Sequence, residues 1–257
     1  MMQETPSFNI KKVRDLSLIE IGRDYIVIAV DSFGGIGAKE HDVVKLSIEE
    51  WAIAILRVPL MEIIASGAQP ILVIDALGVE YEPTGRQVIE TLKRELSRLG
   101  YDGLPLNGST EDNIPVSSSA AGIVILGIVS KEDFSPGTTQ DEDRAFVVGV
   151  PKSGPHERVE LGRDPEIPDI KDLITIRGVS GVHDILPVGS HGIAYEAKEM
   201  AKSANLNIEF FRDLPIDLKK SGGPSTCFLV SSYLPREEIE KFTKAPVFEI
   251  GVFLKKR

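Results

Sequence analysis

The segment Ala29-Val30-Asp31-Ser32-Phe33-Gly34-Gly35-Ile36-Gly37 leads from an apolar run into a carboxylate and then into three closely spaced glycines. The run from Tyr25 to Val30 is rich in β-branched residues and bounded by turn formers, which predicts a buried strand. Glycine lets backbone N–H groups approach an anion closely, so the loop after this strand suits a phosphate. Asp31 would then be a hard oxygen ligand for Mg²⁺ beside that anion. A capped strand followed by an ordinary loop explains the same residues equally well.

The composition predicts a globular protein without a nucleic-acid partner. The chain has 257 residues, enough for one large domain or two modest ones, and a formal net charge of −10. Nucleic-acid binding requires clustered Lys and Arg, but no basic stripe precedes the tail Lys255-Lys256-Arg257. An acidic protein can still bind ATP when Mg²⁺ bridges its carboxylates to the phosphates.

The sequence also predicts no membrane partner and a cytoplasmic location. No apolar run approaches the ~20 residues of a membrane span, and Met1–Arg14 lacks the apolar centre of a signal peptide. The single cysteine, Cys227, excludes an internal disulfide, and its apolar surroundings in the sequence are typical of a buried thiol.

The first half alternates strand-like and helix-like patterns. Ser47 with Glu50 three residues later forms a capping-box signature, which predicts a helix that Pro59 would kink. A second helix is predicted over Thr84–Leu99, with Gly100 as its stop. Strands are predicted at Leu16–Ile21, Tyr25–Asp31, Ile71–Val79 and Gly122–Val129.

The segment Lys131–Asp143 is polar, rich in turn formers and without a period, which predicts a linker or long loop. Residues 1–135 and 144–257 would then form two domains. In the second half, helices are predicted over Ser190–Ala204 and Pro235–Phe242. Strands are predicted at Ala145–Val150, Leu173–Val179, Thr226–Val230 and Val247–Leu254. Strands mixed with one-sided helices indicate two α/β sandwich-like units.

Five motifs follow one another along nearly the whole chain. They are Asp31–Gly37 with His41-Asp42, Met61–Pro70, Asn107-Gly108-Ser109-Thr110, Gly122–Val129, and Gly181–Pro187 with Gly192-Ile193-Ala194. In this order they resemble motifs of the superfamily of aminoimidazole ribonucleotide synthetase, selenophosphate synthetase, thiamine-monophosphate kinase and the hydrogenase-maturation ATPase. The resemblance implies a two-domain α/β architecture of the PurM-like type. Its amino-terminal α/β domain would bind ATP and carry a dimerising sheet, and its carboxy-terminal domain would be an α/β sandwich.

The resemblance also implies the residues of a Mg²⁺–ATP site. The metal ligands would be Asp31, Glu62 and Asp112, and the nucleotide would be bound by Asp31, Gly34, Gly35, Gly37, Asp42, Asn107 and Thr110. The catalytic base would be Asp184 or His183, which belong to the motif expected to face the first domain. Asp184 could equally support the following helix, and His183 could be an ordinary loop histidine. Family members are typically homodimers, so a homodimer is expected here.

Two departures from the family motifs bear on the metal site. Glu62 replaces an aspartate but keeps a hard carboxylate ligand. Ser109 removes a carboxylate from the expected metal shell. Glu111 or Asp112, which follow in the same loop, could replace that carboxylate. Alternatively, Glu111 and Asp112 form a solvated turn. The acidic Gly-Asp-Asp-Ala segment of the family is missing as well. Fewer carboxylates imply fewer metal ions, two instead of several.

These departures from the family motifs exclude two of the activities found in the family. The only thiol is far from the amino terminus and the chain ends in Phe253–Arg257, which excludes the selenide and hydrogenase-maturation chemistries. The remaining resemblance is to synthetase-related ATP-binding proteins. It implies an ATP- and Mg²⁺-dependent kinase that phosphorylates a hydroxyl of a nucleoside-like small molecule, specifically α-ribazole in the salvage of the lower ligand of cobamides. An ATP-dependent ligase or cyclase of the aminoimidazole ribonucleotide synthetase type and a non-catalytic nucleotide-binding protein are the alternatives.

Overall fold

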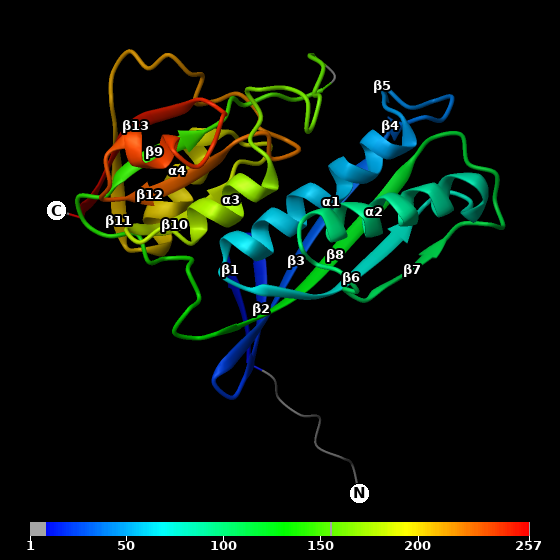
Figure 1. Ribbon diagram of the computed structural model, residues 1–257, viewed down its shortest axis with the longest axis horizontal. Coiled ribbons are helices and arrows are strands. Elements are labelled where there is room, and N and C mark those ends of the chain that lie inside the picture. Colours follow the sequence, from blue (N-terminus) through cyan, green and yellow to red (C-terminus); the bar gives the residue numbers. More distant parts are fainter. Residues whose placement is uncertain (1–8, 155, 257) are drawn as a thin grey trace, which may run out of the picture.

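The computed structural model describes residues 9–154 and 156–256, which fold into two main β-sheets with helices packed against both (Figure 1). The strands of the first half are β1 (Ile10–Val13), β2 (Leu16–Ile21), β3 (Asp24–Gly34), β4 (Ile36–Gly37), β5 (Val44–Lys45), β6 (Gln69–Leu77), β7 (Leu106–Thr110) and β8 (Ala120–Ser130). Those of the second half are β9 (Arg144–Val148), β10 (Val182–Pro187), β11 (Leu206–Phe210), β12 (Phe228–Ser232) and β13 (Val247–Lys255). The helices are α1 (Ile48–Ala65), α2 (Arg86–Arg98), α3 (Ile170–Arg177), α4 (Ile193–Ser203) and α5 (Arg236–Glu240). The predicted α/β class is confirmed.

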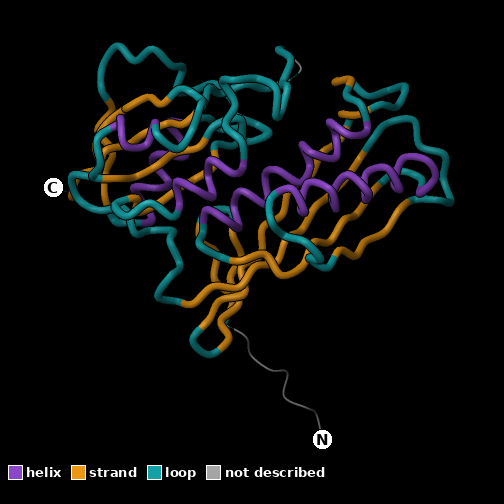
Figure 2. Tube along the Cα trace, viewed as in Figure 1, coloured by secondary structure: helices purple, strands orange, loops and turns teal. Residues whose placement is uncertain are grey.

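The first sheet has the strand order β1-β2-β3-β8-β6-β7. Its two longest strands, β3 and β8, pair antiparallel from Asp24 opposite Ser130 to Gly34 opposite Ala120. Helices α1 and α2 cover one face of this sheet (Figures 1 and 2). Successive residues of a strand point to opposite faces, so Val27 and Ala29 are buried under the helices while Val30 on the other face is 60% exposed.

Helix α1 lies at the centre of the molecule. The predicted capping box is present: the Ser47 side chain accepts a hydrogen bond from the Glu50 backbone N–H, and the Glu50 side chain accepts one from the Ser47 N–H. The helix runs through Pro59 without interruption and is buried on nearly every side, because it packs on β3 and β8 and also on α3 and β10. The larger hydrophobic core therefore contains residues of both halves of the chain.

The second sheet is antiparallel, in the order β10-β12-β9-β13-β11. Its buried residues belong to two cores, one shared with α1 and α3 and the other covered by α4. The prediction of a strand at Leu173–Val179 is wrong, since Ile170–Arg177 form α3. The β-branched residues of this segment favour a strand, but Asp169 and Asp172 form a second capping box that begins a helix.

Other differences concern short elements. The segment Gly181–Pro187 contains strand β10, which was not predicted. Strands β1, β4, β5, β7 and β11 were not predicted either, because each has at most five residues. Residues 131–143 contain no helix or strand and connect the two sheets, while the division into two domains stays a prediction. Within the described residues, no helix is both long and apolar enough to span a lipid bilayer.

Candidate functional site

A cleft of about 1000 Å³ lies where the two halves meet. The first half contributes the end of β3, the segment from Ile36 to Leu46 and one side of α1. The second half contributes residues 153–154 and 156–161, the Gly189-Ser190 pair and the glycine-rich Ser221–Ser225. The wall is largely apolar and carries several hydroxyl groups. Small-molecule sites in proteins combine these features, a mostly apolar concave wall with a few polar groups.

Asp31 lines this cleft from β3 and is half-buried. Burial raises the pKa of its carboxyl group, and a hydrogen bond from the Ser32 backbone lowers it by less. The sequence placed Asp31 at the end of a strand. The structure has Asp31 in strand β3, which continues for three more residues, to Gly34. A carboxylate that is partly desolvated and open to a cleft is favourably placed to meet a cation.

Glu62 lies close to the cleft, on α1. It lines a small adjoining cavity that shares Val58, Gly189 and Ser225 with the main cleft. Burial, together with smaller contributions from the carboxylates of Asp15, Asp31 and Glu196, raises the pKa of Glu62 to about 8. Its Oε2 atom is buried and forms no hydrogen bond with any described residue. Asp31 is therefore near enough to Glu62 to affect its pKa, although the two side chains line different cavities.

The glycine loop is shaped by close packing. Gly34 lines the cleft, whereas the Gly35 N–H donates to the Ser119 carbonyl oxygen at 2.9 Å. Gly37 has a φ of +150°, and a Cβ there would lie 2.5 Å from Ser119 Oγ and 2.9 Å from Asp42 Oδ2. Glycine is thus required at position 37 for a structural reason, and the Gly35 N–H already has a protein partner.

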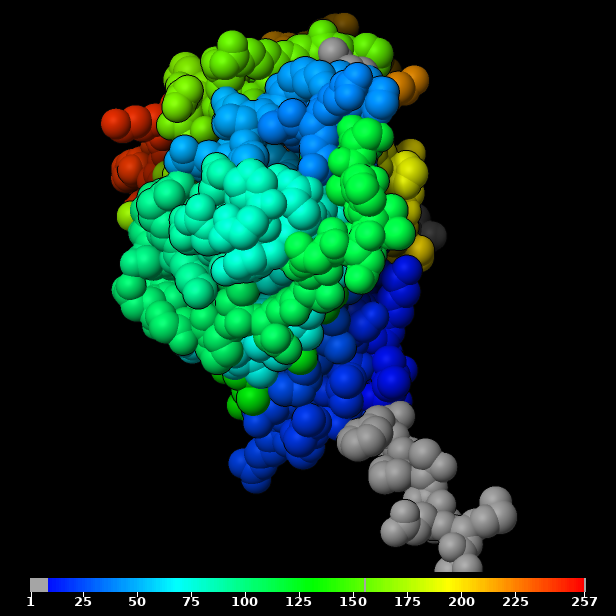
Figure 3. All heavy atoms as spheres, turned by 90° about the vertical axis from the view of Figure 1, so that its right-hand side faces the viewer, coloured from blue at the N-terminus to red at the C-terminus, as the bar shows by residue number. Residues whose placement is uncertain are grey.

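Asp42 fixes this loop to the segment before β8. Its buried carboxylate accepts hydrogen bonds from the backbone N–H groups of Lys39 and Ser119, at 2.8 and 2.6 Å, and from the hydroxyl groups of Ser118 and Ser119. Burial raises the pKa of Asp42, but these hydrogen bonds together hold it below its usual value. In Figure 3 the two segments lie side by side, blue and green, on the surface of the molecule, and the His41 N–H donates to the Ser117 carbonyl. Asp42 does not line the cleft.

The remaining predicted ligands lie on or after β7, outside the cleft. Asp112 is exposed and accepts hydrogen bonds from Thr110 Oγ1 at 2.7 Å and from the Tyr81 N–H at 2.9 Å. These hydrogen bonds lower the pKa of Asp112. Asn107 is exposed on the same edge strand. Within the described ranges, no three His, Cys, Asp or Glu side chains gather closely enough to hold a metal ion, so Asp112 does not join Asp31 and Glu62.

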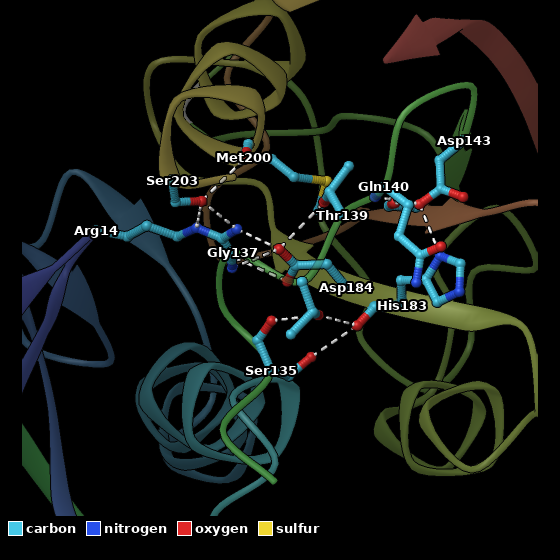
Figure 4. A network of polar contacts seen from close by, with 12 residues as sticks. Arg14, Ser135, Gly137, Thr139, Gln140, Asp143, His183, Asp184, Met200 and Ser203 are labelled. Atoms are coloured by element: carbon cyan, nitrogen blue, oxygen red, sulfur yellow. Dashed lines mark hydrogen bonds and ion pairs between the residues drawn. The ribbon is translucent and has the colours of Figure 1, made fainter. Parts of the chain in front are cut away.

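Asp184 and His183, the two predicted bases, lie on β10 in a separate polar network (Figure 4). Asp184 is fully buried and binds both terminal nitrogens of Arg14, and it also accepts hydrogen bonds from the Gly137 N–H and Thr139 Oγ1. A paired Arg–carboxylate contact of this kind is geometrically specific, and it ties the β1–β2 turn to the second sheet. Neither Asp184 nor His183 lines the cleft.

His183 is oriented by a neighbouring carboxylate. Its Nδ1 atom lies 2.7 Å from Asp143 Oδ2, which also accepts a hydrogen bond from Ser231 Oγ at 2.7 Å. The imidazole ring rests against Tyr233, with 5.6 Å between the ring centroids. In this structure the carbonyl of His183 also accepts hydrogen bonds from Ser135 and Thr138, so both predicted bases hold the linker against β10.

Sequence reasoning missed two buried carboxylates. Glu196 of α4 is 6% exposed and lines the same small cavity as Glu62. Asp75 of β6 is 1% exposed, and neither of its carboxylate oxygens has a hydrogen-bond partner among the described residues. Asp75 shares a sheet face with Asp31, because both lie opposite Ile123 of β8. For Asp75, the signal in the sequence was a single acid inside an apolar run.

The donor set fits Mg²⁺ and phosphate chemistry in part. Asp31 and Glu62 provide hard oxygen atoms. No described residue donates a hydrogen bond to Glu62 Oε2, so the protein does not stabilise a negative charge on this atom in that way. Lys45 is the lysine of the cleft wall, and its Nζ donates to the carbonyl oxygens of Lys39 and Glu40 at 2.6 and 2.8 Å. The arrangement can bind a cation on one side of an apolar cleft and a hydroxylated small molecule on the other.

Comparison with known proteins gives structural relatives only. No protein-family model matches the sequence, and no curated protein matches it. Among solved structures, thiamine-monophosphate kinase from Aquifex aeolicus aligns with a TM-score of 0.65 at 15% identity, over 95% of this chain and 90% of that one. The structure described as AaThiL complexed with AMPPCP and TMP aligns with a TM-score of 0.63 at 16% identity, over 96% of this chain and 87% of that one.

A hydrogenase-maturation protein has the same architecture. HypE from E. coli aligns with a TM-score of 0.61 at 13% identity, over 90% of this chain and 80% of that one. Identities this low establish a shared fold and nothing finer. The protein therefore has the PurM-like fold, the fold of thiamine-monophosphate kinase and HypE.

Proposed function

We propose that the protein transfers the γ-phosphoryl group of ATP to a hydroxyl group of a small molecule, in a reaction that requires Mg²⁺. The observation that carries the proposal is the pair Asp31 and Glu62, two desolvated carboxylates beside a cleft of about 1000 Å³. Phosphoryl transfer needs charge neutralisation and positioning more than covalent chemistry from the protein. The same fold holds AMPPCP and TMP in a thiamine-monophosphate kinase, which supports nucleotide binding here.

The residues would share the work as follows. Asp31 and Glu62 would hold Mg²⁺, which neutralises phosphate charge when bound, and Gly34 would bring backbone close to the phosphates. The hydroxyl groups and glycines of the second-half loops would orient the acceptor. Asn107, Thr110, Asp112, Gly35, Gly37 and Asp42 stay predicted nucleotide contacts, and Asp184 and His183 stay predicted bases. In the structure each of these residues forms hydrogen bonds with other parts of the protein, is packed against them, or lies outside the cleft. A role in nucleotide binding or catalysis would have to be compatible with that position.

The acceptor we propose is nucleoside-like, with α-ribazole as the specific candidate. The cleft wall includes Ile36, Val44, Leu46 and Ile53, an apolar surface suited to a flat aromatic base. Serine hydroxyls on the opposite wall, among them Ser190, would suit the ribose.

We also propose that the protein forms a homodimer through the open face of its first sheet. The register places a continuous set of apolar side chains on that face: Ile26, Ile28, Val30, Leu72, Ile74, Val124, Leu126 and Ile128. Val30 and Ile128 are 60% and 40% exposed. An exposed apolar patch of this kind marks an interaction site, and two identical faces can bury each other about a twofold axis.

The test of the proposed reaction is ³¹P NMR of the protein with ATP, Mg²⁺ and α-ribazole. We expect ADP together with a new phosphomonoester resonance. Asp31→Asn should slow the reaction roughly a thousandfold, since losing a metal ligand costs several kcal/mol of transition-state stabilisation. Asp24→Asn, at the other end of the same strand, is the matched control and should be unaffected.

Three other results would each correct the proposal. ADP with free phosphate and no monoester would indicate a different acceptor or ligase chemistry. ATP binding without turnover would indicate a non-catalytic nucleotide-binding protein. A monoester formed equally well by Asp31→Asn would remove Asp31 from the metal site.

A further inference from the structure

A cavity of about 40 Å³ between the two halves is bounded by carboxyl groups from three separate elements. Glu62 reaches it from α1, Glu196 from α4, and Asp15 from the turn between β1 and β2. A cavity needs about 10–15 Å³ of this kind of volume to hold a single water molecule. By this measure the cavity has room for about three water-sized ligands, which is sufficient for one small ion with about two water molecules.

The two glutamates of this cavity form no ion pair with a described residue, although the charge of Arg14 lowers the pKa of Glu196. Glu62 Oε2 is buried without a hydrogen bond to any described residue. Glu196 is 6% exposed, and the Gly189 backbone is the hydrogen-bonding group that lowers its pKa. The arginine of the cavity wall, Arg14, already binds Asp184 and Ser203. Two buried acids thus face one space without a cation of their own among the described residues.

Burying two acids in this way has an electrostatic cost. Burial raises the pKa of Glu62 to about 8 and that of Glu196 to about 7, and the nearby Asp15 carboxylate raises both. Ionising both groups would be unfavourable unless a cation entered the cavity. Protonation of one or both is the alternative, and it requires no ion.

We propose that Glu62 and Glu196 together bind one divalent cation in this cavity, which joins α1 of the first half to α4 of the second. Glu62 would be shared between this ion and the nucleotide-bound Mg²⁺ proposed beside Asp31. Mg²⁺ in proteins usually keeps several water ligands and takes one or two carboxylates, so these two glutamates are sufficient. The absence of a three-ligand cluster within residues 9–154 and 156–256 is compatible with such a site.

The cation would also organise the cleft. Glu196 lies next to Gly189, where an added Cβ would be 3.3 Å from its Oε1 atom, and Gly189 lines both the small cavity and the main cleft. An ion held by Glu62 and Glu196 would therefore fix the Gly189-Ser190 loop beside the proposed acceptor. The identity of the cation as Mg²⁺ rests on the proposed function, but the existence of the site does not.

The experiment is a Mn²⁺ titration of the full chain without nucleotide, with free Mn²⁺ measured by electron paramagnetic resonance. We expect the wild type to bind one Mn²⁺. Glu196→Gln and Glu62→Gln should each weaken binding at least about tenfold, the scale reported for disturbed metal shells. Glu199→Gln is the matched control, because Glu199 lies one turn further along α4 and pairs with Lys202 at the surface. It should bind Mn²⁺ like the wild type.

Thermal unfolding separates lost binding from lost folding. Glutamine has the shape of glutamate without the charge, so metal-free Glu196→Gln should melt at the wild-type temperature or above it. Mn²⁺ should raise the melting temperature of the wild type and of Glu199→Gln, but not that of Glu196→Gln.

Two outcomes would overturn the inference. The first is a wild type that binds no Mn²⁺ in the absence of nucleotide. The second is that Glu196→Gln binds Mn²⁺ with wild-type affinity while Glu62→Gln no longer binds it. This result would assign the ion to the first half of the chain alone. Neither outcome bears on the phosphomonoester assay. If the protein binds Mn²⁺ as expected but forms no phosphomonoester, only the proposed reaction is overturned.

Discussion

Asp75 shows what a single buried acid does to the stability of this fold. Burial raises its pKa from 3.8 to about 6, and its carboxylate oxygens lack partners among the described residues. An acid with a raised pKa in the folded state lowers stability when it ionises. This loss is absent below about pH 4, grows up to about pH 6 and is complete above it. At about 1.36 kcal/mol for each pKa unit, the loss of stability reaches about 3 kcal/mol.

Asp75→Asn should therefore have the same unfolding free energy as the wild type near pH 4 and exceed it by about 3 kcal/mol near pH 7.5, as measured by urea unfolding. A stability difference independent of pH would contradict this reading of Asp75.

The same scale explains which site residues the sequence could indicate. Asp31 and Glu62 belong to motifs with a local pattern, and both lie at the cleft or beside it. Glu196 and Asp75 have no such pattern, because their burial depends on elements distant in the sequence. Asp184 lies in a recognisable motif, but its partner Arg14 sits in a turn with a φ of +53° after a strand that the sequence did not reveal. Its ion pair could not be predicted without that strand.

At the scale of elements, a capping box begins two of the helices, α1 and α3. The capping box of α1 satisfies backbone N–H groups that would otherwise lack partners at its first turn. Ser47→Ala should lower the unfolding free energy by about 1 kcal/mol, the typical value of an N-cap, as measured by urea unfolding. Ser180→Ala is the control, since Ser180 is exposed and its side chain forms no hydrogen bond with a described residue. Equal stabilities of the two variants would show that the cap of α1 contributes nothing.

The helix that the sequence missed follows the same rule. α1 and α2 were predicted because capping and apolar spacing agree, whereas in α3 they compete with β-branched residues that favour a strand. The Asp169–Asp172 capping box and the burial of Leu173 and Ile176 on one side decide for the helix. Strand order was beyond local patterns altogether, because β8 inserts between β3 and β6 only through long-range pairing.

For the whole molecule, the open face of the first sheet predicts the oligomeric state. Val30 is near the centre of that face and 60% exposed in the single chain, so lysine at this position disturbs no buried contact within one subunit. In a dimer formed through the sheet, the same lysine would bury a charge at the interface, which is strongly unfavourable. Sedimentation analysis should give a dimer for the wild type and a monomer for Val30→Lys. Ile114→Lys is the matched control, because Ile114 is 63% exposed in the loop between β7 and β8 and belongs to no strand of the sheet, and this variant should stay dimeric. A monomeric wild type, or a Val30→Lys variant as dimeric as the control, would contradict assembly through this face, and the nucleotide and acceptor sites would then belong to one chain alone.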